Sequence, residues 1–265
     1  MMRVPHARVL LALALVSLDA GGARAQPAGP PPATPEAPAV PQPSPDPTNF
    51  EGIWQPDFVM PLVNAGEGTS GALATVDRKP LPYNDRGATI FQHRMRMEQA
   101  GTPIANSVSQ YLPAIPVYQL DLFLGQMGVV QDRKNVVILF EDGSNWLIHL
   151  DRGHPAALAP SYKGDSVGHF EGATLVVDSI GFNTKTWLDS VGSPHTAKLH
   201  LTTRISKIEG GRRLEFLTTY EDPDLYTAPF TVRRTASYRP DGQLLESEIE
   251  NLRSENNANL ICEDN

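Results

Sequence analysis

The chain contains only one cysteine, Cys262, so it cannot form an internal disulfide bond. Its stability must therefore come from a packed core, and residues 50–265 are enough for a single domain of sandwich or barrel type. Basic residues are also scarce, because 22 Lys and Arg face 30 Asp and Glu and leave a net charge of −8. Nucleic acids and anionic membranes bind basic surfaces, so this balance argues against both as partners. The partners that remain are a small molecule or another protein.

After its first residues the chain lacks any apolar run long enough to cross a membrane. The start itself combines a basic stretch around Arg3 and Arg8, a short apolar run, and small residues at Ala23 and Ala25. This order is typical of a secretory signal peptide, here expected over residues 1–25. We therefore expect a periplasmic or secreted protein that is not inserted in a membrane.

Residues 26–49 hold ten of the 24 prolines and no aromatic residue. Such a composition buries too little apolar surface to offset the loss of chain entropy, so this segment is expected to be a disordered, Pro-rich linker. The folded part, residues 50–265, is expected to begin with a strand that contains Gly52 and Trp54. A helix is expected over residues 86–101, because Asn84 or Asp85 can cap its start and Gly101 can end it.

From Gly125 onward, apolar and polar residues alternate with a period of two, and β-branched and aromatic residues are frequent. The expected strands cover residues 125–131, 135–141, 145–151, 168–172, 174–182, 198–209, 212–222, 230–238 and 244–251. Successive hairpins of this kind form an antiparallel meander, and about eight strands can close an up-and-down barrel. The predicted fold is thus mainly β, a barrel with a helix-containing N-terminal elaboration.

Two longer segments interrupt the meander, at residues 152–163 and 183–197, and long loops on a barrel often carry function. Five of the seven histidines lie between residues 149 and 200. We expect His169 and His195 to act as acid and base, with Asp165 and Asp189 orienting them. The side chains expected to bind the substrate are those that could form the walls and the polar groups of a pocket nearby. They are Trp146, His149, His154, Tyr162, Glu171, Phe182, Asn183, Trp187, His200 and Arg204.

Two other kinds of site find less support in the sequence. His149 and His154 are five residues apart, as are His195 and His200, and this spacing matches neither a strand face nor a helix face. No metal and no other cofactor is therefore expected. Gly164-Asp165-Ser166-Val167-Gly168 has the letters of a nucleophile elbow, but a hairpin follows where that motif needs a helix.

The block at residues 164–200 resembles a large family of uncharacterised exported bacterial proteins that carry GDSxGxWEGxTLVVDTxGFNxxTWxDxxGxPHSxxLH. Phe170 and Thr196 depart from that pattern, where tryptophan and serine are common. The resemblance implies export and a β-rich fold but no established reaction. In addition, Gly52-Ile53-Trp54 resembles the Gly-x-Trp signature of lipocalins, which implies a lipocalin-like or calycin-like barrel.

Two functions remain open at this point. The first is a cofactor-independent lyase, hydratase or isomerase that uses His and Asp acid–base chemistry on a small apolar or aromatic molecule. The second is a periplasmic lipocalin-like protein that binds such a molecule in the same pocket without turnover. Histidines that point reactively into a pocket favour the enzyme, and histidines engaged only in structural hydrogen bonds favour the binding protein. The oligomeric state does not follow from the sequence.

Overall fold

The computed structural model describes residues 41–57, 73–100, 125–141, 143–189 and 191–245. The expected signal peptide, most of the Pro-rich linker, Cys262 and residues 246–251 of the last expected strand lie outside this part. The described elements follow one another as β1 (Gly52–Pro56), α1 (Asp85–Gln99), β2 (Met127–Gln131), β3 (Asn135–Phe140), β4 (Asn145–His149), β5 (Asp165–Glu171), β6 (Thr174–Ile180), β7 (His200–Ile208), the 3₁₀ turn η1 (Glu209–Gly211), β8 (Arg213–Glu221) and β9 (Phe230–Tyr238).

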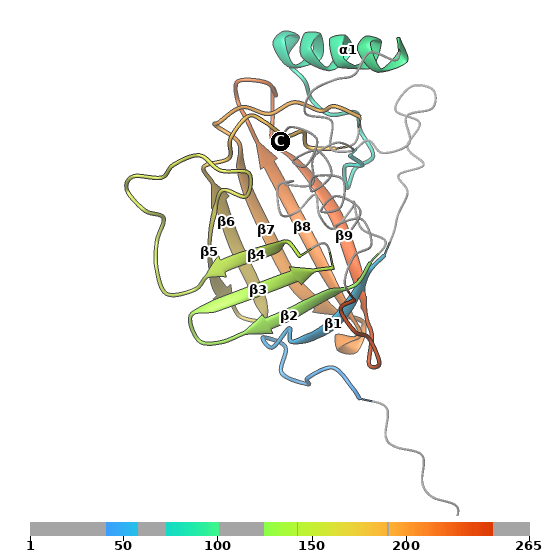
Figure 1. Ribbon diagram of the computed structural model, residues 1–265, viewed down its shortest axis with the longest axis vertical. Coiled ribbons are helices and arrows are strands. Elements are labelled where there is room, and N and C mark those ends of the chain that lie inside the picture. Colours follow the sequence, from blue (N-terminus) through green and yellow to red (C-terminus); the bar gives the residue numbers. More distant parts are fainter. Residues whose placement is uncertain (1–40, 58–72, 101–124, 142, 190, 246–265) are drawn as a thin grey trace, which may run out of the picture. The chain divides into compact units, whose positions relative to one another are not determined.

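The strands form one closed barrel in sequence order, and β1 closes it by pairing with both β2 and β9. The predicted mainly β barrel with a helix before most of its strands is therefore confirmed (Figure 1). The described strands number nine rather than about eight. A closed ring with an odd number of strands cannot have every neighbouring pair antiparallel, so at least one pair must be parallel.

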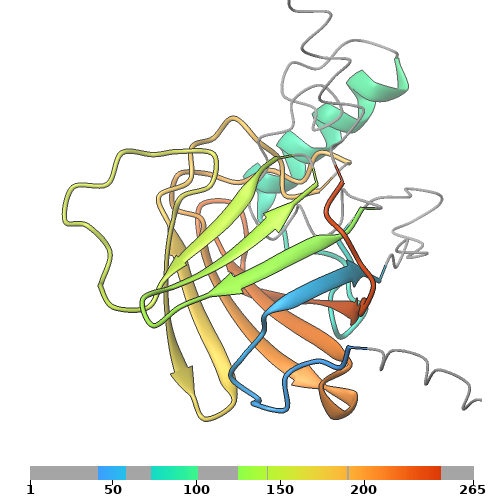
Figure 2. The ribbon, with the colours of Figure 1, turned by 60° about the horizontal axis from the view of Figure 1, so that its bottom comes forward.

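That parallel pair is β4 and β5, which meet at Ile148↔Ser166 and His149↔Val167, whereas the other neighbours are antiparallel. The expectation of a wholly antiparallel meander is corrected here. A parallel neighbour cannot be reached through a tight hairpin, because the chain has to return to the same end. Residues 150–164 make this return, in the wide loop seen at the left of both ribbon views (Figure 2).

The interior of the barrel is filled by the inward-facing side chains of its strands. Trp54, Trp146, Phe216 and Tyr220 are each at most 2 % exposed. The two indole N–H groups are also paired, because Trp54 Nε1 donates to the carbonyl oxygen of Phe50 and Trp146 Nε1 donates to Ser166 Oγ, each at 2.9 Å. Side chains this well buried border no water-sized space, so the described interior is a packed core.

One end of the barrel gathers α1 and the segments 181–199 and 222–229 (Figure 1). Asn84 caps α1 as predicted, because its Oδ1 accepts from the backbone N–H of Gly87 at 2.9 Å. The backbone N–H of Asn84 also donates to the carbonyl oxygen of Leu225 at 2.9 Å. A Cβ on Gly87 would lie 2.3 Å from that oxygen, so glycine allows the helix start to pack against segment 222–229.

At the opposite end, the last linker residues contact the barrel. Lys207 Nζ donates to the carbonyl oxygens of Ser44 and Asp46 at 2.7 and 2.9 Å. Gln131 Nε2 donates to the carbonyl oxygen of Thr48 at 3.0 Å. The described end of the linker is therefore fixed to the strands by its backbone carbonyls.

Candidate functional site

The structure separates the predicted site residues into distinct groups. Asp165 and Glu171 are the first and last residues of β5, so they lie roughly 20 Å apart at about 3.3 Å per residue. Asp189 and His195 belong to the long β6–β7 connection, beside α1. Asp165 therefore cannot orient His169, which lies four residues further along the same extended strand, and the predicted catalytic residues do not form one cluster.

Asp189 organises the β6–β7 connection. It is 1 % exposed, and its carboxylate accepts from the backbone N–H groups of Leu73, Val191 and Ser193 at 3.2, 3.2 and 2.9 Å. The hydroxyl of Ser193 donates to the same carboxylate. Burial raises the pKa of Asp189, and these donors act in the opposite direction. Because its described donors are backbone N–H groups and the Ser193 hydroxyl, the carboxylate fixes the conformation of this connection and does not orient a histidine.

His195 is 6 % exposed, and both of its ring nitrogens are engaged. Nδ1 lies 3.1 Å from the carbonyl oxygen of Thr196, which can only accept, so Nδ1 carries the proton and donates it. Nε2 lies 3.0 Å from Thr186 Oγ1 and accepts from that hydroxyl. Burial lowers the pKa of His195, which therefore stays neutral at pH 7.

Thr196, next to His195, is fixed by a carboxylate that the sequence analysis did not single out. Asp222 accepts from the backbone N–H of Thr196 at 2.5 Å and from its hydroxyl at 2.9 Å. This carboxylate is 2 % exposed and also accepts from the backbone N–H of Asp224 at 3.2 Å. Segments 181–199 and 222–229 are thereby joined directly beneath α1.

Helix α1 contributes an arginine and a neighbouring aromatic stack to this region. Arg94 Nη1 donates to the carbonyl oxygen of Gly192 at 2.8 Å, and its guanidinium lies 5.2 Å from the ring centre of Trp187. Tyr83 precedes the helix, stacks on Tyr226 with ring centres 5.2 Å apart, and shares a 2.8 Å hydrogen bond with the hydroxyl of Ser193. Trp187, predicted to line a pocket, is 2 % exposed and forms the floor under Arg94.

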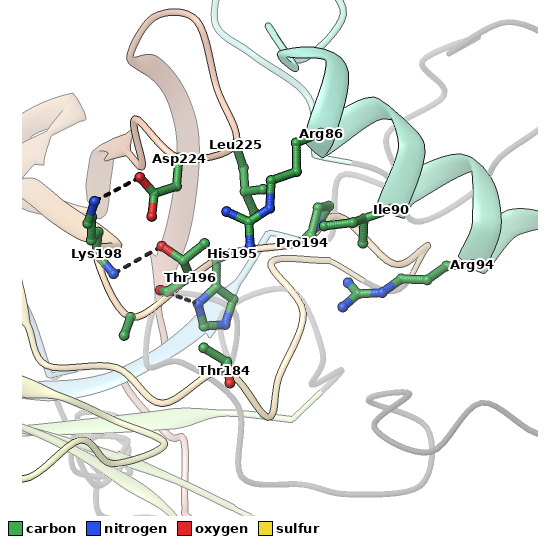
Figure 3. Close-up of a pocket in the computed structure, with 11 residues that line it drawn as sticks. Arg86, Ile90, Arg94, Thr184, Pro194, His195, Thr196, Lys198, Asp224 and Leu225 are labelled. Carbon is green, nitrogen blue, oxygen red and sulfur yellow. Dashed lines mark hydrogen bonds and ion pairs between the residues drawn. The ribbon is translucent and has the colours of Figure 1, made fainter.

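A cleft of about 430 Å³ opens between α1 and the segments 181–199 and 222–229 (Figure 3). We call it the α1 cleft. Its lining residues are Arg86, Ile90, Arg94, Thr184, Pro194, His195, Thr196, Ala197, Lys198, Asp224 and Leu225. Its volume lies within the range of about 300–1,000 Å³ that small-molecule sites occupy. Of the predicted catalytic residues, only His195 lines it.

A second group lies on the outer face of β5–β8, and we call it the outer His–Asp network. It consists of Arg152, His154, Asp165, Asp178, His200 and Glu221. His154 Nδ1 lies 2.7 Å from Asp165 Oδ2, and its Nε2 lies 3.4 Å from Asp178 Oδ2. His200 Nε2 contacts the other oxygen of Asp178. Two predicted residues, His154 and His200, thus meet through a carboxylate that was not predicted.

Arg152 completes the network by donating to Asp165 at 2.5 Å. Burial acts to raise the pKa of Asp165, but the hydrogen bonds from Arg152 and His154 outweigh it and leave the pKa below its usual value. Asp165 is therefore ionised at neutral pH. It fastens the returning segment 150–164 to the start of β5.

The third group is a surface cluster further along β5. His169 Nε2 lies 3.3 Å from Glu171 Oε1, and Arg204 Nη1 lies 2.9 Å from Glu171 Oε2. The imidazole of His169 is 67 % exposed, in contrast to the buried environment that tunes an acid–base histidine. The hydrogen bonds from Arg204 and His169 lower the pKa of Glu171.

The remaining predicted residues have structural surroundings. Phe182 is fully buried, and Trp146 Nε1 donates to Ser166 Oγ at 2.9 Å inside the barrel. His149 Nδ1 contacts Asn135 Oδ1 at 3.0 Å, and Asn183 Oδ1 accepts from the backbone N–H of Lys185 at 2.9 Å. For Tyr162 the structure shows a half-buried position in segment 150–164.

His200 and Arg204, both predicted to bind the substrate, alternate along β7 with buried residues. Leu201, Thr203 and Ile205 are buried inside the barrel, so His200 and Arg204 point outward. Ser166 likewise points inward and is only 3 % exposed. This position does not suit a hydrolytic nucleophile, which has to reach a substrate.

The described residues contain no group of three or more His, Cys, Asp or Glu side chains arranged to hold a metal ion. Within the same residues, no helix has the length and apolar character of a membrane span. Comparison of the chain with protein-family models, curated proteins and solved structures gives no match. What the protein does must therefore be argued from its own geometry.

Sequence analysis missed the side of the α1 cleft that the helix provides. Arg86, Ile90 and Arg94 are spaced by four residues, so they share one face of α1. That spacing was visible in the sequence. What was not visible is that this face lies opposite His195, which is more than 100 residues away in the chain.

Proposed function

We propose that the protein is an exported binding protein that holds a small molecule in the α1 cleft without converting it. The observation that carries this proposal is the state of His195. It is the predicted catalytic residue that lines the cleft, yet both of its ring nitrogens are already hydrogen-bonded, to Thr186 and Thr196. A general base must reach the proton that it takes with a free nitrogen, and His195 has none to offer.

Acid–base catalysis by His195 would also need a carboxylate hydrogen-bonded to its ring, and no described carboxylate makes such a bond. Asp189 is saturated by donors from Leu73, Val191 and Ser193 and makes no described hydrogen bond to the imidazole. A neutral, hydrogen-bonded histidine next to Pro194 and Leu225 suits a wall that shapes a site. By the criterion set from the sequence, this arrangement favours binding.

Native mass spectrometry tests the proposal. The full chain is purified from the compartment to which it is exported, and its native mass is compared with its denatured mass. We expect an organic mass excess that is lost in Ala197→Trp, because Ala197 is exposed at the cleft and a tryptophan there fills it. Ala156→Trp, at an exposed position in segment 150–164, is the matched control and should keep the ligand. Retention of the ligand by a folded Ala197→Trp variant would show that the cleft is not the site.

An acid–base enzyme is the second candidate, and one specific observation favours it. The outer His–Asp network pairs His154 with Asp165 and His200 with Asp178, which is how carboxylates orient catalytic imidazoles. Once a ligand is identified, its turnover can be measured with the wild type and with His154→Ala and His200→Ala. Turnover that falls in both variants while binding persists would favour the enzyme.

A further inference from the structure

The α1 cleft differs in charge from the molecule as a whole. The chain has a net charge of −8, whereas the cleft is lined by Arg86, Arg94 and Lys198 against Asp224 alone. His195 adds no charge, because burial lowers its pKa. A local excess of positive charge on an acidic protein attracts anions to one place on its surface.

Three lining side chains come from one face of α1. Arg86, Ile90 and Arg94 follow one another at intervals of four residues, and Figure 3 shows both guanidinium groups reaching from the helix toward His195. Arg94 is anchored by Gly192 and Trp187, so its position is set before a ligand arrives. Arg86 makes no ion pair or hydrogen bond with any described residue and is free to engage a ligand.

The acids near the cleft are already engaged. Asp224 Oδ1 lies 2.8 Å from Lys198 Nζ, so these two charges compensate each other. Asp222 is buried and accepts from Thr196. Neither acid is available to neutralise Arg86, which is left as the uncompensated charge of the cleft, whereas Arg94 is also attracted by the buried Asp189.

Apolar side chains complete the lining. Ile90, Pro194 and Leu225 offer carbon surface between and beside the arginines. A ligand that fits has one anionic group for the guanidinium pair and an apolar body for this surface. Guanidinium groups match carboxylates well, because they can donate two parallel hydrogen bonds.

We propose that the ligand of the α1 cleft is a small amphipathic carboxylate, bound through Arg86 and Arg94 with its apolar part on Ile90, Pro194 and Leu225. This inference rests on the proposed binding function and names the class of its ligand. It also restricts the expected ligand, a small apolar or aromatic molecule, to molecules that carry a negative charge.

A charge series with a constant apolar tail tests the inference. Octanoate, octan-1-ol and octyltrimethylammonium are titrated into the full chain, and binding is followed by the NMR signals of the His195 ring, which report on the cleft itself. We expect octanoate to bind at least about tenfold more tightly than the alcohol, a difference of about 1.4 kcal/mol, and the cation to bind least. Octanoate affinity should also fall as salt is raised.

Arg86→Gln should lower octanoate affinity several-fold and leave octanol binding unchanged. Arg239→Gln is the matched control, since it removes one exposed positive charge at the opposite end of the barrel. Equal binding of octanoate and octanol, with no effect of Arg86→Gln, would overturn the carboxylate inference and leave binding in the cleft intact. If none of the three compounds shifts the His195 signals and native mass spectrometry finds no ligand, both proposals fail.

Discussion

His154 lies between two carboxylates, with Nδ1 2.7 Å from Asp165 Oδ2 and Nε2 3.4 Å from Asp178 Oδ2. Among the described residues, the buried Nε2 atom has no hydrogen-bond partner. His154 thus ties segment 150–164 to β5 through Asp165 and lies against Asp178 of β6.

We predict that His154→Ala loosens segment 150–164 without unfolding the barrel. The substitution removes the bridge to Asp165 and Asp178, and the segment keeps fewer ties to the strands. Amide hydrogen exchange within residues 150–164 should become faster, whereas exchange in β8 and β9 should not change. His169→Ala is the control, because its imidazole is 67 % exposed. Unchanged exchange in the segment would contradict the bridging role.

Burial of His195 predicts a specific dependence of stability on pH. Its pKa is lowered in the folded protein, so the unfolded chain takes up the proton first, below about pH 6.5. The neutral, buried His195 makes its full contribution to stability above that pH. This contribution is lost as the pH falls further, through the lowered pKa of the folded protein. His195→Gln cannot titrate, so it should lose less stability than the wild type between pH 7.5 and pH 5. Urea unfolding at both pH values measures this difference, and parallel losses would refute the prediction.

Gly192 is expected to resist substitution for two reasons. Its φ is +98°, and an added Cβ would lie 3.3 Å from Arg94 Cβ and Cδ. Gly192→Ala should cost about 1–3 kcal/mol from backbone strain, together with displacement of Arg94 from Trp187. Gly143→Ala has a φ of +77° with nothing within 4 Å of the new Cβ, so it isolates the strain. Only the Gly192 variant should change tryptophan fluorescence.

Ser166 is predicted to be a structural residue of the core. Its hydroxyl accepts from Trp146 Nε1 at 2.9 Å and bonds Ser179 Oγ at 2.7 Å. Ser166→Ala leaves a buried N–H unpaired and should cost about 1–3 kcal/mol of unfolding free energy. Ser206→Ala, whose hydroxyl bonds Thr174 on the outer face, should cost less. Labelling of Ser166 by a fluorophosphonate probe would argue instead for a nucleophile.

The strands were predictable because their signal is local. A period of two, interrupted by turn residues, located β2–β4 and β6–β9 to within a few residues of their observed bounds. The Asn84 cap was predictable for the same reason, since a cap and its helix are neighbours in the chain. The start of β5 at Asp165 was missed, because the expected strand began only at Gly168.

The site was much less predictable. Asp165, His169 and Glu171 alternate along one face of β5, and their closeness in sequence suggested one cluster. The extended chain instead spreads them along the strand, and Asp165 joins His154 across the returning loop. Arg86 and Arg94 carried no signal toward His195, because contacts between distant segments depend on how the barrel closes.

The sequence by itself determined a β-rich domain that contains a capped helix and is expected to be exported, because alternation, caps and turn residues act over a few neighbouring positions. Only the tertiary structure decided that β4 and β5 run parallel and that the histidines fall into separate groups. The tertiary structure also decided that both ring nitrogens of His195 are hydrogen-bonded. The physical reason is that strand pairing and loop docking are set by long-range packing of a closed barrel, which no local pattern encodes.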